Sequence, residues 1–276
     1  MNKHKHKTRS KTRRSRKAMV ACVVIAVAVV IGLLLGTGYG RRLTNRVRNA
    51  MQMHSVTVPY AQSYGIDVSH YQGEIDWTKV KTINFNIATR RQTADDKSAS
   101  VGIDFVFAKS TEGATEVDEY LEKNRDGAHK AGLRFGVYHV LSLKKAQQQY
   151  QNFIKNAKLV PGDLVPVIDI EEEWVGKADI AKVRETVKEL AKLMTKKYGQ
   201  KPIIYCGQSY GQELFGRDKE LGGYPKWIPR YNTGQRPSGA DIWQYAQTGT
   251  VAGITGEVDL DALYSEQHEL EDYILK

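Results

Sequence analysis

Cysteine is scarce in this 276-residue chain, which holds only Cys22 and Cys206. Cys22 lies inside an apolar run and Cys206 ends a predicted strand, so we expect no disulfide between them. The count excludes a small scaffold held together by disulfides. The sequence also lacks an internal repeat and a glycine-rich loop that would cradle phosphate. With 41% hydrophobic residues, the length fits one large globular domain or two small ones.

Acidic residues are missing from the first 48 positions, which hold 13 Lys and Arg and no Asp or Glu. The rest of the chain holds 28 Lys and Arg against 31 Asp and Glu, a balance of −3, although the whole chain carries +10. The positive charge therefore belongs to a tail. Because the folded part has no basic excess, we expect no nucleic-acid partner.

Charge is also absent from residues 18–38, a run of 21 residues that begins after the basic tail. A helix of about 1.5 Å per residue and this length spans the hydrocarbon core of a bilayer, roughly 30 Å. Nine Lys and Arg precede the run and four follow it, which favours a cytoplasmic N-terminus. The sequence predicts a basic cytoplasmic tail over 1–17, a transmembrane signal anchor over 18–38 and a linker over 39–62, followed by an extracellular domain over 63–276. Release after cleavage of the anchor stays open.

Beyond this linker, short apolar runs alternate with helical patterns. The predicted strands cover 64–69, 105–110, 135–140, 165–171, 202–206, 226–231, 241–246 and 257–263, and the predicted helices lie near 117–131, 143–158 and 179–198. Gly199 is expected to end the last helix. This order predicts an α/β fold with a mostly parallel sheet. Since residues 207–257 read as loops and strands, we expect an irregular, partly open β/α barrel. The polar segment 84–100 is expected to be a surface loop.

Asp169 and Glu171 end the apolar run VPVIDIE and share one face of its strand. Two like charges this close compete, so we expect one of the two pKa values to rise and that carboxyl to keep its proton near neutral pH. A protonated acid beside an ionised one is the pair that glycoside cleavage requires. Acids that open a helix offer another explanation for Glu172 and Glu173, but not for an aspartate inside the apolar run.

Asp67 and Asp259 also end apolar runs, GIDVS and EVDLDAL. Each of these acids could equally cap a loop. If the sheet closes, however, the first and last strands become neighbours and the two acids meet. Five aromatic residues lie in predicted strands or at their ends and suit either sugar stacking or core packing: Tyr138, Trp227, Tyr231, Trp243 and Tyr245.

The motifs YGIDVSHYQGEIDW, FVFAKSTEG, GVYHV, VIDIE, IIYCG, KWIPRY, DIWQYA and VDLD, in this order, resemble the glycoside hydrolase family 25 lysozymes. The resemblance covers residues 63–265. It implies a flattened, incomplete β/α barrel (TIM-like) and an N-acetylmuramidase that cleaves the β-1,4 bond between N-acetylmuramic acid and N-acetylglucosamine in peptidoglycan. It implies no metal or organic cofactor, and His70, His129 and His139 do not have the close spacing of a metal site.

The resemblance also assigns roles. It implies that Glu171 is the general acid, that Asp169 positions or stabilises the intermediate, and that Asp67 and Asp259 line the cleft. Tyr138, Trp227 and Tyr231 are expected to contact sugar, whereas Lys109 and Glu112 belong to a motif with a partly structural role. Trp243 is a further substrate-binding candidate. Tyr71 stands where the family often has tryptophan, and YHV replaces the more usual YHF. Inversion, a covalent intermediate and participation of the N-acetyl group all fit these acids.

A second interpretation is a cell-wall-binding or assembly module, part of a membrane-anchored apparatus, in which the acids are vestigial. The presence of all four acids argues against it. Among hydrolases, the membrane segment suits an autolysin, a phage lysin or an enzyme that opens the wall for a secretion or transfer apparatus. The sequence does not decide among these. Peptidoglycan glycan strands are the expected partner in each.

Overall fold

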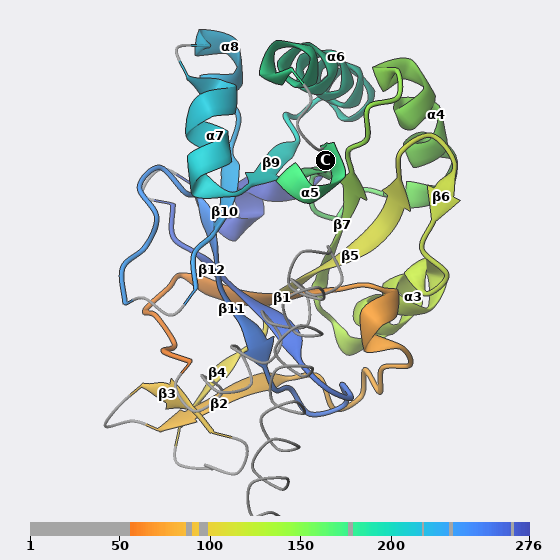
Figure 1. Cartoon of the computed structure of the whole chain (residues 1–276). Helices are drawn as coiled ribbons and strands as arrows, with labels where there is room; N and C mark the ends of the chain where they lie inside the picture. Colours follow the sequence, from red (N-terminus) through yellow and green to blue (C-terminus); the bar gives the residue numbers. More distant parts are fainter. Residues whose placement is uncertain are drawn as a thin grey trace, which may run out of the picture. The chain divides into compact units, whose positions relative to one another are not determined.

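The computed structural model of the chain describes residues 56–276 except 87–89, 94–98, 176–178, 217, 232–233 and 266–267 (Figure 1). The chain divides into two units, residues 1–53 and 54–276, and the described residues all belong to the second. The predicted tail 1–17 and anchor 18–38 lie outside them, so the anchor stays a prediction. Within the described ranges, no helix is long and apolar enough to cross a membrane.

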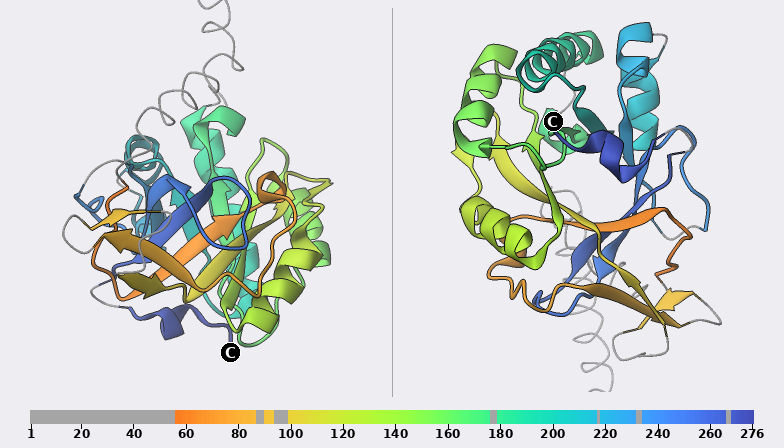
Figure 2. Two further views of the ribbon diagram at one scale, coloured as in Figure 1. Left: turned by 90° about the horizontal axis from the view of Figure 1, so that it is seen from below. Right: turned by 180° about the vertical axis from the view of Figure 1, so that it is seen from behind.

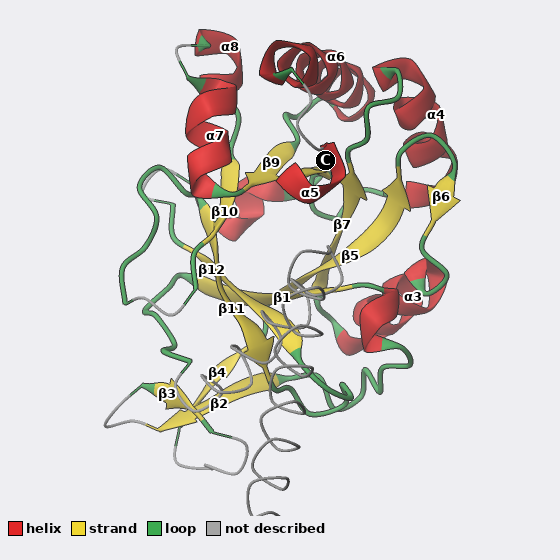
Figure 3. Ribbon diagram, viewed as in Figure 1, coloured by secondary structure: helices red, strands yellow, loops and turns green. Residues whose placement is uncertain are grey.

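Eight strands form a closed ring, coloured yellow in Figure 3. They are β1 (Ser63–Val68), β5 (Phe105–Glu112), β7 (Arg134–Val140), β8 (Val167–Ile170), β9 (Ile203–Cys206), β10 (Lys226–Pro229), β11 (Ile242–Gly249) and β12 (Val258–Leu263). Each matches a predicted strand. Neighbours from β1 through β5 to β11 are parallel, and β12 runs antiparallel to both β11 and β1. The prediction of a partly open barrel is wrong, because β1 pairs with β5 as well as with β12 and leaves no gap.

Helices cover only part of this ring, as expected (Figure 2). The three predicted helices are α3 (Leu121–Ala131), α4 (Ala146–Ala157) and α6 (Ile180–Tyr198). The Asp179 side chain accepts a hydrogen bond from the Ala181 amide at the start of α6, and Gly199 ends it in the left-handed conformation. No helix occurs among the described residues between β10 and β12.

The short helix α5 (Glu172–Val175) begins at Glu172, as in the alternative explanation of a helix opened by acids, whereas α7 (Gln208–Phe215) and α8 (Lys219–Gly222) were not predicted. The prediction of loops between 207 and the next strand is therefore wrong for α7 and α8. In α7 only Gly211, Leu214 and Phe215 are buried, so its sequence carries little apolar periodicity. A single turn such as α8 is too short to show a period.

The segment 84–100 is not simply a loop. Its described residues contribute to a three-stranded antiparallel sheet of β2 (Thr82–Asn86), β3 (Arg91–Gln92) and β4 (Ser100–Gly102), in the order β3-β2-β4. Phe85 in β2 is 6% exposed, so this segment also contributes to the core. Val56 and Val58, inside the predicted linker, are buried too, and the Val58 amide donates to the carbonyl of Arg90. The folded part thus begins before Ser63.

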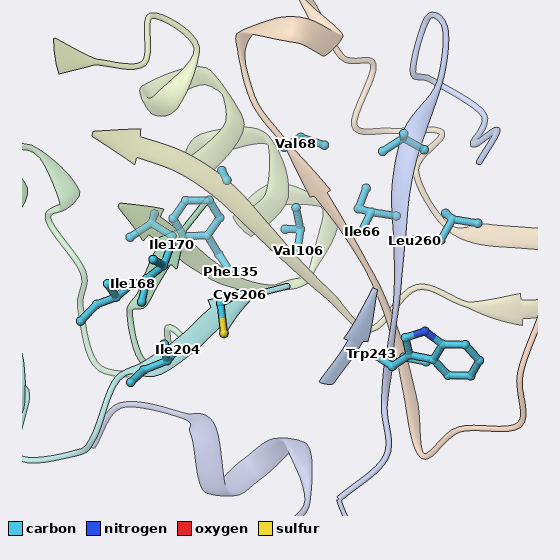
Figure 4. Packing of buried hydrophobic residues seen from close by; sticks show 14 of the residues in the cluster. Ile66, Val68, Val106, Phe135, Ile168, Ile170, Ile204, Cys206, Trp243 and Leu260 are labelled. Atoms are coloured by element: carbon cyan, nitrogen blue, oxygen red, sulfur yellow. The ribbon is translucent and has the colours of Figure 1, made fainter. Parts of the chain in front are cut away.

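Both faces of the barrel strands are buried, and each face packs in its own hydrophobic cluster. Outward-facing residues such as Ile66, Val106, Ile168 and Leu260 pack in one cluster (Figure 4). A second, inner cluster fills the barrel floor with large side chains, including Phe105, Phe107, Val167, Ile203 and Trp227. Two short helical turns, His70–Gln72 and Leu270–Tyr273, complete the fold. The short strand β6 (Glu116–Val117) pairs with the end of β5.

Two glycines make room for the inner rings. A Cβ on Gly65 would lie 2.1 Å from the ring of Phe105, and one on Gly136 would lie 2.5 Å from the ring of Phe107. Real Cβ atoms do not approach this closely, so each strand needs glycine where a phenylalanine crosses the barrel. Above this floor, toward the carboxyl ends of the parallel strands, the barrel opens into a cleft.

Candidate active site

A cleft of about 670 Å³ opens above this floor and takes in all four predicted acids, Asp67, Asp169, Glu171 and Asp259. It lies at the carboxyl ends of the parallel strands, where barrel enzymes carry their chemistry. The inner face of the strands changes there from apolar to polar. On β8, for example, Val167 belongs to the floor, while Asp169, two residues later, lines the cleft. The prediction that these strand ends converge is confirmed.

Asp67 is held firmly inside the cleft. It is 7% exposed, and its Oδ2 accepts a hydrogen bond of 2.7 Å from the side-chain amide of Gln244. The Gln244 carbonyl oxygen in turn accepts from the hydroxyls of Tyr205 (2.9 Å) and Tyr231 (2.5 Å), which fixes the amide in the orientation that donates to Asp67. Burial raises the Asp67 pKa to about 7, although the hydrogen bond from Gln244 lowers it.

Asp259 lies directly opposite Asp67 in the antiparallel pair of β1 and β12. This is the juxtaposition expected if the sheet closes, and it is confirmed. Asp259 is partly exposed on the cleft side. Its removal from water raises its pKa well above the usual range, and the charges of Asp67 and Glu171 raise it further.

Asp169 and Glu171 differ in exposure. Asp169 is 5% exposed and its Oδ1 has no hydrogen-bond partner, whereas Glu171 is half-buried just beyond the end of β8. Burial raises the Asp169 pKa well above its usual range, and the nearby charges of Glu171 and Asp67 add to the effect. The expected rise of one pKa in this pair is confirmed, and it falls on Asp169. Glu171 accepts a 3.1 Å hydrogen bond at Oε2 from the indole N–H of Trp174 in α5.

Among the predicted sugar-contacting residues, Tyr138, Trp227 and Tyr231 line the cleft. Trp227 is only 2% exposed and packs between Phe107 and Tyr205, with ring centroids 5.1 and 5.0 Å away, so it forms part of the floor.

The assignment of Trp243 to the substrate site is wrong. It is 2% exposed in the outer cluster, where Figure 4 shows it beside the barrel strands, and its indole N–H donates to the carbonyl of Arg230. Tyr245 belongs to the same outer cluster. The physical reason is strand alternation, because Gln244 points into the barrel and its neighbours therefore point out.

Lys109 does not line the cleft wall either. Its ammonium group forms an ion pair of 2.7 Å with Glu112, and both side chains are largely buried. The positive charge acts on Asp169 and opposes the rise in that pKa. Lys109 is therefore a buried partner of Glu112 and is not among the residues that line the cleft.

Three polar residues of the site escaped the prediction: Tyr205, Gln244 and Asp261. Asp261 is fully buried, and its Oδ1 accepts a 2.9 Å hydrogen bond from the indole N–H of Trp227. The sequence did carry a signal for it, since Asp261 follows Asp259 at the same two-residue step that pairs Asp169 with Glu171. For Gln244 the signal was weaker, because it consists only of one polar residue inside the apolar run DIWQYA. Within the described part of the chain, no three His, Cys, Asp or Glu side chains form a cluster that could hold a metal ion.

Comparison with known families identifies this arrangement. The sequence profile described as "Glycosyl hydrolases family 25" matches residues 66–254, which include Asp67, Asp169 and Glu171. The chain belongs to this family. The resemblance to family 25 lysozymes, and with it the prediction of a glycoside hydrolase, is confirmed.

Relatives and solved structures agree with this family 25 assignment. The protein YegX of Escherichia coli is 32% identical over 217 residues, which cover 76% of this chain and 73% of YegX. The autolytic lysozyme of Clostridium acetobutylicum is 28% identical over 200 residues, or 71% of this chain and 54% of that protein. A solved family 25 glycosyl hydrolase from Bacillus anthracis aligns with a TM-score of 0.64 and 27% identity, covering 80% of this chain and 98% of the other. Membership of this lysozyme family supports peptidoglycan hydrolysis in general.

Proposed function

We propose that the protein is an N-acetylmuramidase that cleaves the β-1,4 bond between N-acetylmuramic acid and N-acetylglucosamine in peptidoglycan. The observation that carries the proposal is the convergence of Asp67, Asp169, Glu171 and Asp259 in one cleft of a family 25 barrel. Carboxyls that differ in burial supply both an acid and a charged stabiliser within reach of one glycosidic bond.

In this proposal Glu171 donates the proton to the leaving oxygen. It is more exposed than Asp169 and lies on the cleft surface, where a glycosidic oxygen can approach it. The Trp174 indole N–H stabilises the carboxylate that remains after proton donation. Asp169 lies one strand step deeper, in a position to orient the substrate and, in its ionised form, to stabilise developing positive charge.

Asp67 and Asp259 form the opposite wall. When one of these paired carboxyls is ionised, its charge favours positive charge in the cleft, as an oxocarbenium-like transition state requires. Tyr138 of β7 and Tyr231 also line the cleft and provide ring surface for sugar contacts.

The site of action is part of the proposal. The basic tail 1–17 and the uncharged run 18–38 support a single-pass anchor with a cytoplasmic N-terminus, which would present the barrel to the wall outside the membrane. Fractionation into membrane and medium, for the full chain and for a variant lacking residues 1–40, tests this directly. Equal recovery of both forms in the cytoplasm would rule out an anchor.

The activity is tested by incubating the full chain, solubilised in mild detergent, with purified cell walls. We expect new reducing ends, and borohydride reduction of the products should convert muramic acid, not glucosamine, to its alcohol. Glu171→Gln should abolish this release, whereas Glu185→Gln on the exposed face of α6 should not. Sedimentation with walls but no reducing ends from the wild type would instead favour the wall-binding module.

A further inference from the structure

Asp261 is a fully buried acid for which the proposed cleavage has no direct use. It lies in the middle of β12, opposite Gly65 of β1 and Gln244 of β11. Its Oδ1 accepts the indole N–H of Trp227 at 2.9 Å. Its Oδ2 is also buried, and no N–H or O–H group of the described residues donates to it. A buried carboxylate oxygen without a donor is costly, so this atom requires an explanation.

The explanation lies in the neighbouring acid. Asp67 lies two residues along β1 from Gly65, the pairing partner of Asp261, and Gln244, which is opposite Asp261 on β11, donates to Asp67. Both acids are therefore buried on the inner face of neighbouring strands. Two ionised carboxylates there could not bond to each other, because both are acceptors only, whereas a proton on one of them would give the Oδ2 of Asp261 a partner. Asp67 already accepts from Gln244, and the Oδ1 of Asp261 already accepts from Trp227, which leaves the Oδ2 of Asp261 as the atom free to carry the proton.

The surroundings favour a neutral Asp261. The acids that act on it are Asp67 from β1 and Asp259 from its own strand, both of the same sign, and the hydroxyls of Tyr231 and Tyr245 lie near enough to interact with it. Within the described ranges, no Lys or Arg forms an ion pair with Asp261. Burial, together with the two neighbouring charges, raises the Asp261 pKa well above its usual range.

We propose that Asp261 is a permanently protonated positioning residue, which donates a hydrogen bond to Asp67 and so directs that carboxylate into the cleft. Asp67 then receives two donors, Gln244 and Asp261, which fix its orientation and favour its ionised form. Trp227 in turn orients Asp261 through the hydrogen bond from its indole N–H. The proposal rests on the proposed function only in giving Asp67 a part in glycoside cleavage.

The protonation state is tested without any assay of activity. Asp261→Asn replaces the neutral acid with an amide that can still donate to Asp67 and accept from Trp227. In the wild type, stability should fall as the pH rises above 4, because the unfolded chain then releases a proton that folded Asp261 keeps. The midpoint of thermal unfolding of Asp261→Asn should therefore match that of the wild type at pH 4 and exceed it by roughly 5 °C or more at pH 7.5. A difference that does not grow with pH, or a variant less stable at pH 7.5, would overturn the proposal.

The positioning role is tested by comparing two substitutions in the full chain. Asp261→Ala removes the donor, and kcat for wall hydrolysis should fall about tenfold to hundredfold with KM little changed, because Asp261 does not touch substrate. Asp261→Asn should restore kcat to within about threefold of the wild type. Equal losses in both variants, with both folded, would show that Asp261 itself needs to ionise and would refute the role. If the wild type releases no reducing ends, the muramidase proposal fails, while the thermal comparison still decides the protonation.

Discussion

Asp67 and Asp259 face each other across β1 and β12, although they come from the first and last strands of the barrel. This contact exists only because the ring of strands closes, and it turns two isolated acids into one wall of a cleft. The other wall carries Asp169 and Glu171 at the end of β8. Burial in this cleft, together with the charges of the neighbouring acids, raises the pKa values of Asp67, Asp169 and Asp259.

The Asp67 carboxyl makes the folded protein less stable at neutral pH. Its pKa rises from 3.8 to about 7 on folding, so the folded state keeps a proton that the unfolded state releases, and stability is lost as the pH rises from about 4 through about 7. Asp67→Asn removes this loss. We expect it to raise the free energy of unfolding at pH 7.5 by up to about 4 kcal/mol and to change little at pH 4.

The same variant should lose most of its activity on cell walls, since Asn cannot supply the charge of Asp67. Urea unfolding at the two pH values measures the gain in stability, and release of reducing ends measures the loss of activity. Equal stability of the two proteins at pH 7.5 would contradict the buried position of the charge.

Gln244 supplies a neutral donor to Asp67 and accepts from two tyrosines. Gln244→Glu keeps the shape and the acceptors but removes the donor and adds a fifth acid to the cleft. We expect a loss of about 2–4 kcal/mol in stability at neutral pH and at least tenfold in activity. Both losses should shrink at lower pH, where the new acid is neutral. Gln212→Glu, on the exposed side of α7, is the matched control and should be silent.

Trp174 donates to Glu171 from a position that is 43% exposed. Trp174→Phe keeps an aromatic ring and removes the N–H. Since a hydrogen bond to a charged group at a partly exposed site is worth about 1 kcal/mol, kcat should fall about fivefold. The donor favours the ionised carboxylate, so the alkaline limb of the pH–rate profile should move to higher pH. An unchanged pH–rate profile would show that Trp174 does not act on the general acid Glu171.

Trp243 is a core residue by its position, and its replacement should affect stability alone. Trp243→Phe loses ring volume and the hydrogen bond to the Arg230 carbonyl, so we expect a destabilisation of about 1–3 kcal/mol in thermal unfolding. Activity below the transition should stay within about twofold. Tyr231→Phe is the contrasting variant, because it removes a hydroxyl from the Gln244 network in the cleft and should lower activity about tenfold.

Much of this architecture could be predicted from the sequence. Eight apolar runs became the eight barrel strands, and the run DIAKVRETVKELAKLMTKKYG became α6, because a strong 3.6-residue period and a terminal glycine are local signals. The strand around Phe85 was missed, although Ile83 and Phe85 alternate with polar residues as in a half-buried strand. Helix α7 was missed because its sequence carries little apolar periodicity.

The sequence by itself determined which strands end in acids and that Asp169 and Glu171 form a pair, since alternation along one strand is a local property. Only the tertiary structure decided which face of β11 lines the cleft. In a barrel both faces of a strand are buried, so Trp243 and Gln244 cannot be assigned to outside and inside from their polarity pattern. Closure of the ring likewise brought Asp67 to Asp259 and Asp261, because contacts between distant strands depend on register and not on any local period.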